Sequence, residues 1–529
     1  MERTPDTSAP WDVLRARLGE KQVLTDEETR VLYSTDFSEE HRPAAAAILL
    51  PGSTEEVSEA VKLATSAGYA VIPRGGGMTY TRGFVPEREQ SVILDLGRLN
   101  RVLAVDTEDL FVSVEAGVTW KQLREALRGK GYRVPFMGTL SGVRATVGGG
   151  LGNNATGVGR GDITDHLLGL EVVAYDGRVI QTGALATGSA TPLHRYFGPD
   201  LTGLFVHDGG ALGIKTRAAF RLVKNPGGTA YSSFGFRDRH SMVSALVAIA
   251  KLGVHSEMFA FERYHHDQFA TQPKPSAAEA KALLREIVSS SPSRFRGLVN
   301  VLRTVRPGGL KYLSAWDFSL NIVIDAFDHA SAERAMAAAR KLARRHGGTR
   351  LPAALSIALR ADPFMPVDRL IVGMKGANSF PSNGNVPLSR AHEFISALES
   401  FFAENAAVMK EHGIEKTIIC VSPHGLFGVE PILYWHDRMN PLRASILTGE
   451  QRTEYGKIPP NSAATEAAIR LRHGLRDLFE RLGCIHYGIG KYYPYRSAVK
   501  NEDNWRTLQE LKHLLDPSHL GNPGALGLD

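Results

Sequence analysis

The sequence predicts an α+β protein built from two domains. Three observations support this prediction. Strand-like and helix-like segments alternate over residues 46–96, and three consecutive glycines interrupt them at residues 75–77. After Pro226 the composition shifts to two strand–helix units, which suggest an antiparallel sheet backed by helices. A chain of 529 residues, 43% of them hydrophobic, can bury two sizeable cores.

The first part of the chain contains a strand–helix–strand unit. The strand 46–50 ends at Pro51, Ser53 supplies a cap for the following helix, and Gly68 closes that helix. We expect helices at residues 11–18, 27–33, 57–67 and 119–130, and strands at 46–50, 69–72, 91–96, 102–106 and 111–115.

The glycine run lies in the segment VIPRGGGMTYTRG, at the end of the second strand of this unit. Three residues without Cβ atoms allow the backbone to turn sharply and to press its N–H groups against a ligand. Such a turn binds anions, and Arg74 adds a positive charge beside it. The expected ligand is a diphosphate. The segment lacks the Gly-Lys-Ser/Thr of a nucleoside-triphosphate loop and the Gly-x-Gly-x-x-Gly spacing of a plain dinucleotide fingerprint.

Two further glycine-rich segments follow. Residues 135–166 read PFMGTLSGVRATVGGGLGNNATGVGRGDITDH, with no long apolar periodicity, so we expect a long loop that is ordered around a ligand. The strands 170–175 and 179–182 are joined by Asp176-Gly177, a hairpin signal. The glycine element 209–216 precedes the strand 216–222.

The second part of the chain is expected to form a sheet with helices of its own. A polar, proline-bearing stretch, residues 271–307, separates its two strand–helix units. We expect strands at residues 231–236, 257–262, 319–327, 417–421 and 432–435, and helices at 240–252, 331–346, 389–412, 465–482 and 504–515.

Composition narrows the function classes. The net charge of +6 is spread along the chain and no basic block with interleaved aromatic residues occurs, so nucleic acid is not an expected partner. Two cysteines, Cys420 and Cys484, give neither a disulfide framework nor a metal spacing. The polar residues 1–10 do not resemble a signal peptide, and no run is long enough to span a membrane. The sequence therefore predicts a cytoplasmic protein.

The order of these motifs resembles the vanillyl-alcohol oxidase/PCMH superfamily of FAD-dependent oxidoreductases. The segments that carry the resemblance are RPAAAAILLPGSTEEVSEAVKLA, VIPRGGGMTYTRG, TVGGGLGNNATG with LLGLEVVAYDGRVIQTG, GPDLTGLFVHDGGALGIKT, and YGIGKYYPYR with LLDPSHLGNPG. The resemblance implies a two-part PCMH-type FAD-binding domain plus an antiparallel-sheet cap domain backed by helices. The implied boundaries are residues 1–226 for the FAD-binding domain, to which residues 484–529 return, and 227–483 for the cap or substrate domain.

The resemblance also implies the residues that bind FAD. They are Pro73, Arg74, Gly75, Gly76, Gly77, Met78, Thr79, Gly83, Gly138, Thr139, Thr146, Gly148, Gly149, Asn154, Gly213, Ile214 and Asn522. Relatives that tether FAD through the first loop have a histidine directly after the glycines, where this chain has Met78. A thioether cannot form that link, so we predict noncovalent FAD.

Two branches of the superfamily suggest different catalytic residues. D-2-hydroxy-acid dehydrogenases are favoured by GPDLTGLFVHDGGALGIKT and by IHYGIGK, which makes His486 a candidate base and Lys491 a nearby cation. In this turn Tyr487 stands where the branch has glycine and Ile485 where it has an acid. Of that branch's metal ligands only His424 survives, with Glu430 a poor substitute, so no metal site is predicted.

Oxidases of para-substituted phenols form the other branch. Their phenolate is held by a tyrosine–arginine pair, which Tyr493 or Tyr495 could supply together with Arg496. The segment GNNATGVG has no aspartate where that branch has one. His486 also fits a buried structural histidine, and the tyrosines also fit packing at a domain interface.

The predicted function is the transfer of a hydride from an alcohol-type carbon of a small anionic substrate, a 2-hydroxy acid, to flavin N5. One alternative is the oxidation of para-substituted phenols, and another is a non-redox synthase that resembles the ether-lipid synthases. The expected partners are a small-molecule substrate and an electron acceptor, which is oxygen, a quinone or a cytochrome. The oligomer that the sequence allows us to expect is a homodimer.

Overall fold

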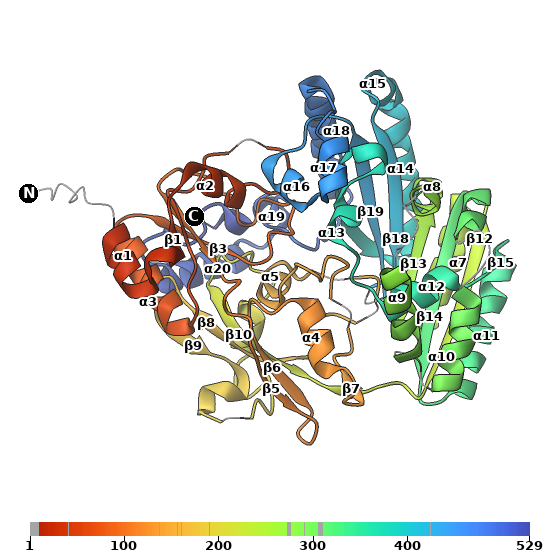
Figure 1. Cartoon of the computed structure of the whole chain (residues 1–529), viewed down its shortest axis with the longest axis horizontal. Helices are drawn as coiled ribbons and strands as arrows, with labels where there is room; N and C mark the ends of the chain where they lie inside the picture. The colour runs from red at the N-terminus through yellow and green to blue at the C-terminus, as the bar shows by residue number, and fades with distance from the viewer. Residues whose placement is uncertain are drawn as a thin grey trace, which may run out of the picture.

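The computed structural model has two lobes that lie side by side (Figure 1). The first lobe contains the strands before residue 225, and the second contains one large sheet with its helices. The structure describes residues 10–40, 42–136, 138–155, 157–159, 161–189, 191–271, 277–289, 291, 293–304, 310–423 and 425–528.

The first sheet is small and contains the predicted strand–helix–strand unit. Its strand order is β1-β2-β4-β3, and β4 pairs in parallel with both β2 and β3. Val57 and Val61 of the covering helix pack on Val71 and Val92 of the strands. The elements are α1 (Trp11–Leu18), β1 (Val23–Leu24), α2 (Glu27–Tyr33), β2 (Ala47–Leu49), α3 (Thr54–Ser66), β3 (Ala70–Arg74) and β4 (Ser91–Asp95).

The second sheet is antiparallel, with strand order β5-β6-β10-β8-β9. Val112 and Val114 join the main hydrophobic core with Trp120, whereas Phe111 of the same strand packs in a smaller cluster. A capping box at Thr119 and Gln122 begins α4. The elements are β5 (Val102–Asp106), β6 (Phe111–Glu115), α4 (Trp120–Leu127), β7 (Tyr132–Arg133), α5 (Val147–Asn153), β8 (Leu167–Val173), β9 (Val179–Gln181), α6 (Leu201–Leu204), β10 (Ile214–Arg221) and β11 (Val223–Lys224).

The second lobe is organised on one eight-stranded sheet, which we call the cap sheet. Its path is β15-β12-β14-β13-β18-β19-β16, and β17 pairs with β19. All of its pairings are antiparallel. The strands are β12 (Gly228–Phe236), β13 (Glu257–Glu262), β14 (Phe318–Ala326), β15 (Thr349–Leu351), β16 (Asn378–Pro381), β17 (Gly384–Pro387), β18 (Glu415–Val421) and β19 (Leu426–Trp435).

Helices cover both faces of the cap sheet. Ile322 and Ile324 of β14 face the main core, whereas Val323 between them packs with Ile357 and Ile287 on the opposite face. The helices are α7 (Arg239–Ala250), α8 (Arg263–Thr271), α9 (Ala277–Ser289), α10 (Arg294–Thr304), α11 (His329–Arg345), α12 (Ala354–Ala361), α13 (Val367–Ile371), α14 (Ala391–Glu404), α15 (Ala406–Glu411), α16 (Pro441–Ile446), α17 (Gly449–Tyr455) and α18 (Ser462–Arg481).

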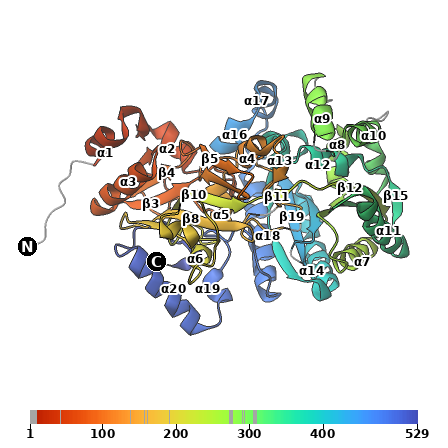
Figure 2. The same ribbon diagram turned by 90° about the horizontal axis from the view of Figure 1, so that it is seen from below.

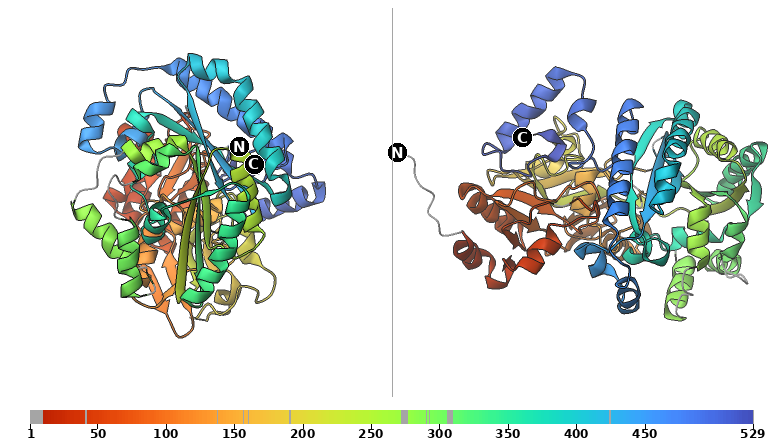
Figure 3. Two further views of the ribbon diagram at one scale, coloured as in Figure 1. Left: turned by 90° about the vertical axis from the view of Figure 1, so that its right-hand side faces the viewer. Right: turned by 90° about the horizontal axis from the view of Figure 1, so that it is seen from above.

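The C-terminal segment returns to the first lobe. Figure 2 shows α19 (Tyr495–Ala498) and α20 (Glu502–Leu515) against the strands of that lobe. Gly521 forms a parallel bridge with Val71, and the buried Lys512 donates to the carbonyls of Ala211 and Gly521. In Figure 3 (right) this segment is the dark blue pair of helices, at the end of the molecule opposite the green helices.

The α+β fold class is confirmed, with three local corrections. Residues 135–166 contain α5, because Thr146 caps a helix within the glycine-rich segment. The stretch 271–307 contains α9 and α10, because Leu283 and Ile287 form an apolar stripe that packs on the cap sheet. The predicted helix 389–412 is two helices that meet at Asn405, whose side-chain amide donates to the carbonyl of Phe401. Among the described residues, no helix is both long and apolar enough to cross a lipid bilayer.

Candidate active site

A glycine-lined cavity of about 820 Å³ lies where three segments of the first lobe meet. The first segment follows β3, the second surrounds α5, and the third precedes β10. Most of the residues predicted to bind a cofactor line it: Pro73, Arg74, Gly75, Gly76, Gly77, Met78, Thr79, Gly83, Thr139, Thr146, Gly148, Gly149, Gly213 and Ile214. Segments from distant parts of the sequence therefore form one site.

The first loop has room for no side chain at its centre. A Cβ atom on Gly76 would lie 1.9 Å from the carbonyl oxygen of Arg144, and one on Gly75 would lie 2.3 Å from Oγ1 of Thr146. The N–H groups of Gly75, Gly76 and Gly77 donate no hydrogen bond to a described residue. Free N–H groups on a tight glycine turn are the donors that a phosphate oxygen requires.

The buried side chain of Arg74 packs against this loop. Its guanidinium lies 2.5 Å from a carboxylate oxygen of Asp95, and its Cζ lies 4.5 Å from the centre of the Tyr33 ring. The side chain is 5% exposed, and a Cβ on Gly77 would lie 2.4 Å from its Nη2. The charge that the sequence places beside the ligand is thus largely neutralised by Asp95, and Arg74 fixes the loop.

The second and third segments are also held by defined contacts. Oγ1 of Thr146 accepts from the N–H of Gly149 at the start of α5. The carboxylate of Asp208 accepts from the N–H groups of Gly210 and Leu212 and forms a buried ion pair with Lys215. These contacts fix the two backbone segments against the first loop.

Three residues that were predicted to bind the cofactor lie behind the cavity wall. Gly138 packs against the ring of Trp120, and Asn154 ends α5 and donates to Asp162 at 3.3 Å. Asn522 is fully buried, and its amide donates to the carbonyls of Gly83 and Gly209. Asn522 therefore ties the first loop to the third.

Sequence reasoning missed other residues of this wall, including Asn153 and Lys215. Asn153 directly precedes the predicted Asn154, and its buried Oδ1 has no partner among the described residues. The motif GNNATG marked the correct turn, but it did not show which of the two asparagines faces inward.

A second and larger cavity, of about 1680 Å³, opens from the first. The two cavities share Met78, Thr79, Thr139, Ser141, Asn153 and Ala155. The second cavity lies between the first lobe and the face of the cap sheet formed by β13, β18 and β19. Its apolar lining consists of Phe37, Leu140, Val158, Phe261, Phe269, Met365, Leu370, Ile371, Pro381, Ile419, Val421, Val429 and Ile432.

A few polar groups interrupt this apolar lining. The hydroxyl of Tyr80 donates to Oε1 of Glu430 at 2.9 Å. His265 is fully enclosed, and burial lowers its pKa to about 3, so its ring is neutral. The remaining polar side chains of the lining include Gln268, Arg369, Asn383, Asn385, Arg443 and Tyr487.

Two of the predicted catalytic residues support the wall of the second cavity. Nδ1 of His486 donates to the carbonyl of Asn383 at 2.6 Å, and the His486 ring stacks on Tyr493 at 3.8 Å. The hydroxyl of Tyr493 accepts from the N–H of Asn383. Burial lowers the pKa of His486 to about 4, which keeps it neutral. Both residues thus hold Asn383, which lines the cavity. From the turn that follows His486, Tyr487 and Gly488 also line the cavity.

The other three predicted catalytic residues lie farther along the chain. Arg496 forms an ion pair with Glu502 at 2.8 Å, and its side chain is 44% exposed. Nζ of Lys491 donates to the carbonyl of Val85, and Tyr495 begins α19. None of the three lines either cavity. This placement does not favour Arg496 as a substrate-binding residue, because the chain leaves the cavity after Gly488.

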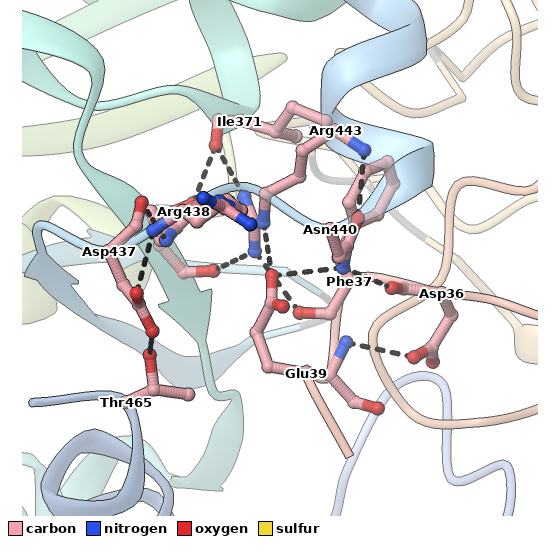
Figure 4. A network of polar contacts seen from close by, with 12 residues as sticks. Asp36, Phe37, Glu39, Ile371, Asp437, Arg438, Asn440, Arg443 and Thr465 are labelled. Carbon is pink, nitrogen blue, oxygen red and sulfur yellow. Dashed lines mark hydrogen bonds and ion pairs between the residues drawn. The ribbon is translucent and has the colours of Figure 1, made fainter. Parts of the chain in front are cut away.

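A buried arginine joins the two lobes at one side of the second cavity (Figure 4). Arg443 of α16 is fully buried, and its Nε donates to Glu39 at 2.6 Å. Its other nitrogens donate to the carbonyls of Phe37, Ile371 and Ser379. Since Phe37, Ile371 and Arg443 all line the cavity, this network fixes part of its wall.

No cluster of three or more metal-ligating side chains occurs in the part of the chain that the structure describes. His424, the one predicted remnant of a metal site, lies outside the described residues.

Comparisons with known proteins agree with this geometry. Residues 45–183 match the family model described as the FAD binding domain. The glycolate oxidase subunit GlcD of Bacillus subtilis is 30% identical over 200 residues, which cover 37% of this chain and 41% of that protein. The mitochondrial D-2-hydroxyglutarate dehydrogenase of Arabidopsis thaliana is 32% identical over 206 residues, or 38% of this chain and 35% of that protein. Each match thus spans less than half of the relative.

The fold of nearly the whole chain is shared with a solved structure. The 4-ethylphenol oxidase from Gulosibacter chungangensis superimposes with a TM-score of 0.75 at 18% identity, covering 99% of this chain and 98% of that one. The predicted fold and the FAD prediction are confirmed by these matches.

The residues present fit FAD. The N–H groups of the first loop have no partner within the part of the chain that the structure describes, and Gly76 has no room for a Cβ, as a diphosphate held by backbone requires. Next to it, the buried Nε of Arg74 and Oδ1 atoms of Asn153 and Asn522 have no hydrogen-bond partner among the described residues.

Proposed function

We propose that this chain, whose residues 45–183 belong to the FAD binding domain family, is an oxidoreductase that acts on a largely apolar hydroxylated molecule. The observation that carries the proposal is the second cavity, which opens directly from the glycine-lined one and shares six residues with it. A substrate in the second cavity would lie next to a cofactor in the first.

The cofactor is held by backbone rather than by charge. The N–H groups of the loop 75–77 bind the diphosphate, and the Arg74–Asp95 pair keeps that loop in place. Asn522 holds the first and third loops together. FAD, when bound, accepts a hydride from the substrate carbon. Met78 lines both cavities and offers no atom for a histidyl link, so we propose that FAD is bound noncovalently.

The lining of the second cavity favours a para-substituted phenol or a similar aromatic alcohol. Most of the residues that line this cavity are apolar. An aromatic substrate would replace water along this lining, and the few polar groups would orient its hydroxyl. Tyr493, Tyr495 and Arg496, which the phenol-oxidase branch suggested for this role, do not line this cavity, so we propose that another group receives the hydroxyl.

A second candidate is the oxidation of a 2-hydroxy acid. Arg369 lies on the cavity wall and has the charge that a carboxylate requires. The matched relatives named as a glycolate oxidase subunit and a D-2-hydroxyglutarate dehydrogenase also support this candidate.

An anaerobic substrate panel tests both candidates. FAD-loaded protein is mixed with 4-alkylphenols, aromatic alcohols and D-2-hydroxy acids without oxygen, and the visible flavin band is followed. We expect bleaching by an aromatic member of the panel. Bleaching only by hydroxy acids would select the second candidate. Binding that shifts the band without bleaching it would favour a non-redox use of FAD.

The same arrangement supports a division into two domains. We propose residues 1–226 with 484–529 as the FAD-binding domain and 227–483 as the cap that supplies the substrate cavity. The electron acceptor, a homodimer and the cytoplasmic compartment remain predictions that the panel does not address.

A further inference from the structure

A buried glutamate faces the substrate cavity, and its hydrogen-bond partner is a tyrosine. Glu430, in the middle of β19, lines the second cavity together with Tyr80, which follows the glycine loop. The phenolic hydroxyl of Tyr80 donates to Oε1 of Glu430 at 2.9 Å across a sequence separation of 350 residues. Among the described residues, no cation lies within ion-pair distance of Glu430.

The environment of Glu430 suits a proton acceptor. Burial raises the pKa of the Glu430 carboxyl above the ordinary value of 4.5, and the hydrogen bond from Tyr80 lowers it in part. Burial, and then the neighbouring Glu430, raises the pKa of the Tyr80 hydroxyl well above 10.0, so Tyr80 stays a donor. The other titratable or charged side chains on the cavity wall are His265, Arg369, Arg443 and Tyr487.

These neighbours leave Glu430 as the acceptor of choice. His265 is a weak base, because burial lowers its pKa to about 3. Arg443 is engaged by Glu39 and three backbone carbonyls, and an arginine accepts no proton at neutral pH. Burial raises the pKa of the Tyr487 hydroxyl, which makes it a donor.

We propose that Glu430 is the catalytic base, and that Tyr80 is a positioning residue that orients the Glu430 carboxylate. The proposal rests on the proposed function and names the group that this function requires. The substrate hydroxyl loses its proton to Glu430, while the hydride of the reacting carbon leaves to the bound FAD. The substrate is thereby oxidised by two electrons, and Glu430 ends as a neutral carboxylic acid, whose proton later returns to water.

A purely structural role is the competing explanation. The Tyr80–Glu430 hydrogen bond also joins the glycine loop of the first lobe to the cap sheet, so it could serve as a clasp alone. A clasp needs only the hydrogen bond, which glutamine at position 430 can also accept. A base needs the carboxylate. The substitution Glu430→Gln therefore separates the two roles without removing volume.

The first readout is the ionisation of a bound phenol, which requires no turnover. FAD-loaded protein is titrated with 4-nitrophenol at a pH below the solution pKa of this ligand, and the phenolate absorbance is read from difference spectra. We expect wild-type protein to bind it as the phenolate and Glu430→Gln to bind it as the neutral phenol. In Tyr80→Phe, loss of the donor raises the pKa of Glu430 further, so ionisation persists and its pH midpoint changes.

Tyr434→Phe is the matched control. Tyr434 lies four residues from Glu430 on the same strand and face, and it is outside the cavity lining. This variant should bind 4-nitrophenol as the wild type does. An equal phenolate band in Glu430→Gln and wild type would overturn the proposal, and so would the absence of the band from wild-type protein.

The second readout is the rate of anaerobic flavin bleaching. With a substrate that bleaches the wild type, Glu430→Gln should slow bleaching by about 100- to 10,000-fold and abolish the acidic limb of the pH profile. Less than a threefold change would overturn the proposal. A different result would contradict the proposed function alone: no member of the panel bleaches wild-type protein, while 4-nitrophenol still shows an ionisation that depends on Glu430.

Discussion

The substitution Gly76→Ala should weaken FAD binding while leaving the apoprotein folded. The added Cβ would lie 1.9 Å from the Arg144 carbonyl oxygen, about 1 Å short of the 3.0 Å below which real Cβ contacts essentially do not occur. Because the obstacle is backbone, the loop 75–77 must move away and its N–H groups lose their alignment. Overpacking of this kind costs about 1–3 kcal/mol, which corresponds to a loss of affinity of about 5- to 150-fold.

The assay is a titration of apoprotein with FAD, followed by quenching of flavin fluorescence. A thermal melt of each apoprotein separates weaker binding from a loss of folding. Gly449→Ala is the matched control, since a Cβ there would meet nothing within 4 Å. An unchanged FAD affinity for Gly76→Ala, with the control also unchanged, would refute the close-approach reasoning.

Four further predictions concern the rest of the site. Arg443→Ala should lower the free energy of unfolding by about 3–5 kcal/mol in a urea titration, because it leaves Glu39 buried without its partner; an unchanged midpoint would contradict this. FAD should appear in the supernatant after acid precipitation, since Met78 allows no histidyl link; colour that stays with the pellet would show a covalent bond elsewhere. Arg496→Ala should keep the rate of flavin bleaching within about twofold, since it forms a half-exposed ion pair with Glu502; a large loss would return Arg496 to the site. Burial lowers the pKa of His486 to about 4 and that of His265 to about 3, from 6.5. The unfolded chain therefore binds more protons, and the free energy of unfolding falls as the pH drops below 6.5. In urea titrations, the free energy that is lost between neutral pH and pH 5 should be about 2 kcal/mol smaller for His486→Gln than for the wild type, and equal losses would oppose the assignment of His486 as a buried neutral histidine.

The cofactor cavity could be predicted from the sequence because backbone forms most of it. The run Gly75-Gly76-Gly77 and the glycines around α5 are needed wherever chain approaches chain or ligand without a side chain between them. The glycines that meet this requirement can be recognised directly in the sequence. The exact inward-facing residue was harder to predict, as the exchange of Asn154 for Asn153 shows.

The substrate cavity could not be predicted in the same way. It is formed by side chains from both lobes, and its central pair, Tyr80 and Glu430, is separated by 350 residues. The motif YGIGKYYPYR drew attention to Arg496, although the turn contributes Tyr487 and Gly488 to the cavity before the chain leaves it. A sequence motif does not show which of its residues line a cavity and which lie beyond it.

Hydride removal from a carbon of an apolar substrate is the central claim, and an isotope effect tests it most directly. FAD-loaded protein is mixed without oxygen with a 4-alkylphenol carrying hydrogen or deuterium at the benzylic carbon, and the bleaching rates are compared. We predict full bleaching that deuterium slows several-fold. Bleaching at equal rates would contradict rate-limiting hydride transfer, and the absence of bleaching by any aromatic substrate would contradict the account of the second cavity.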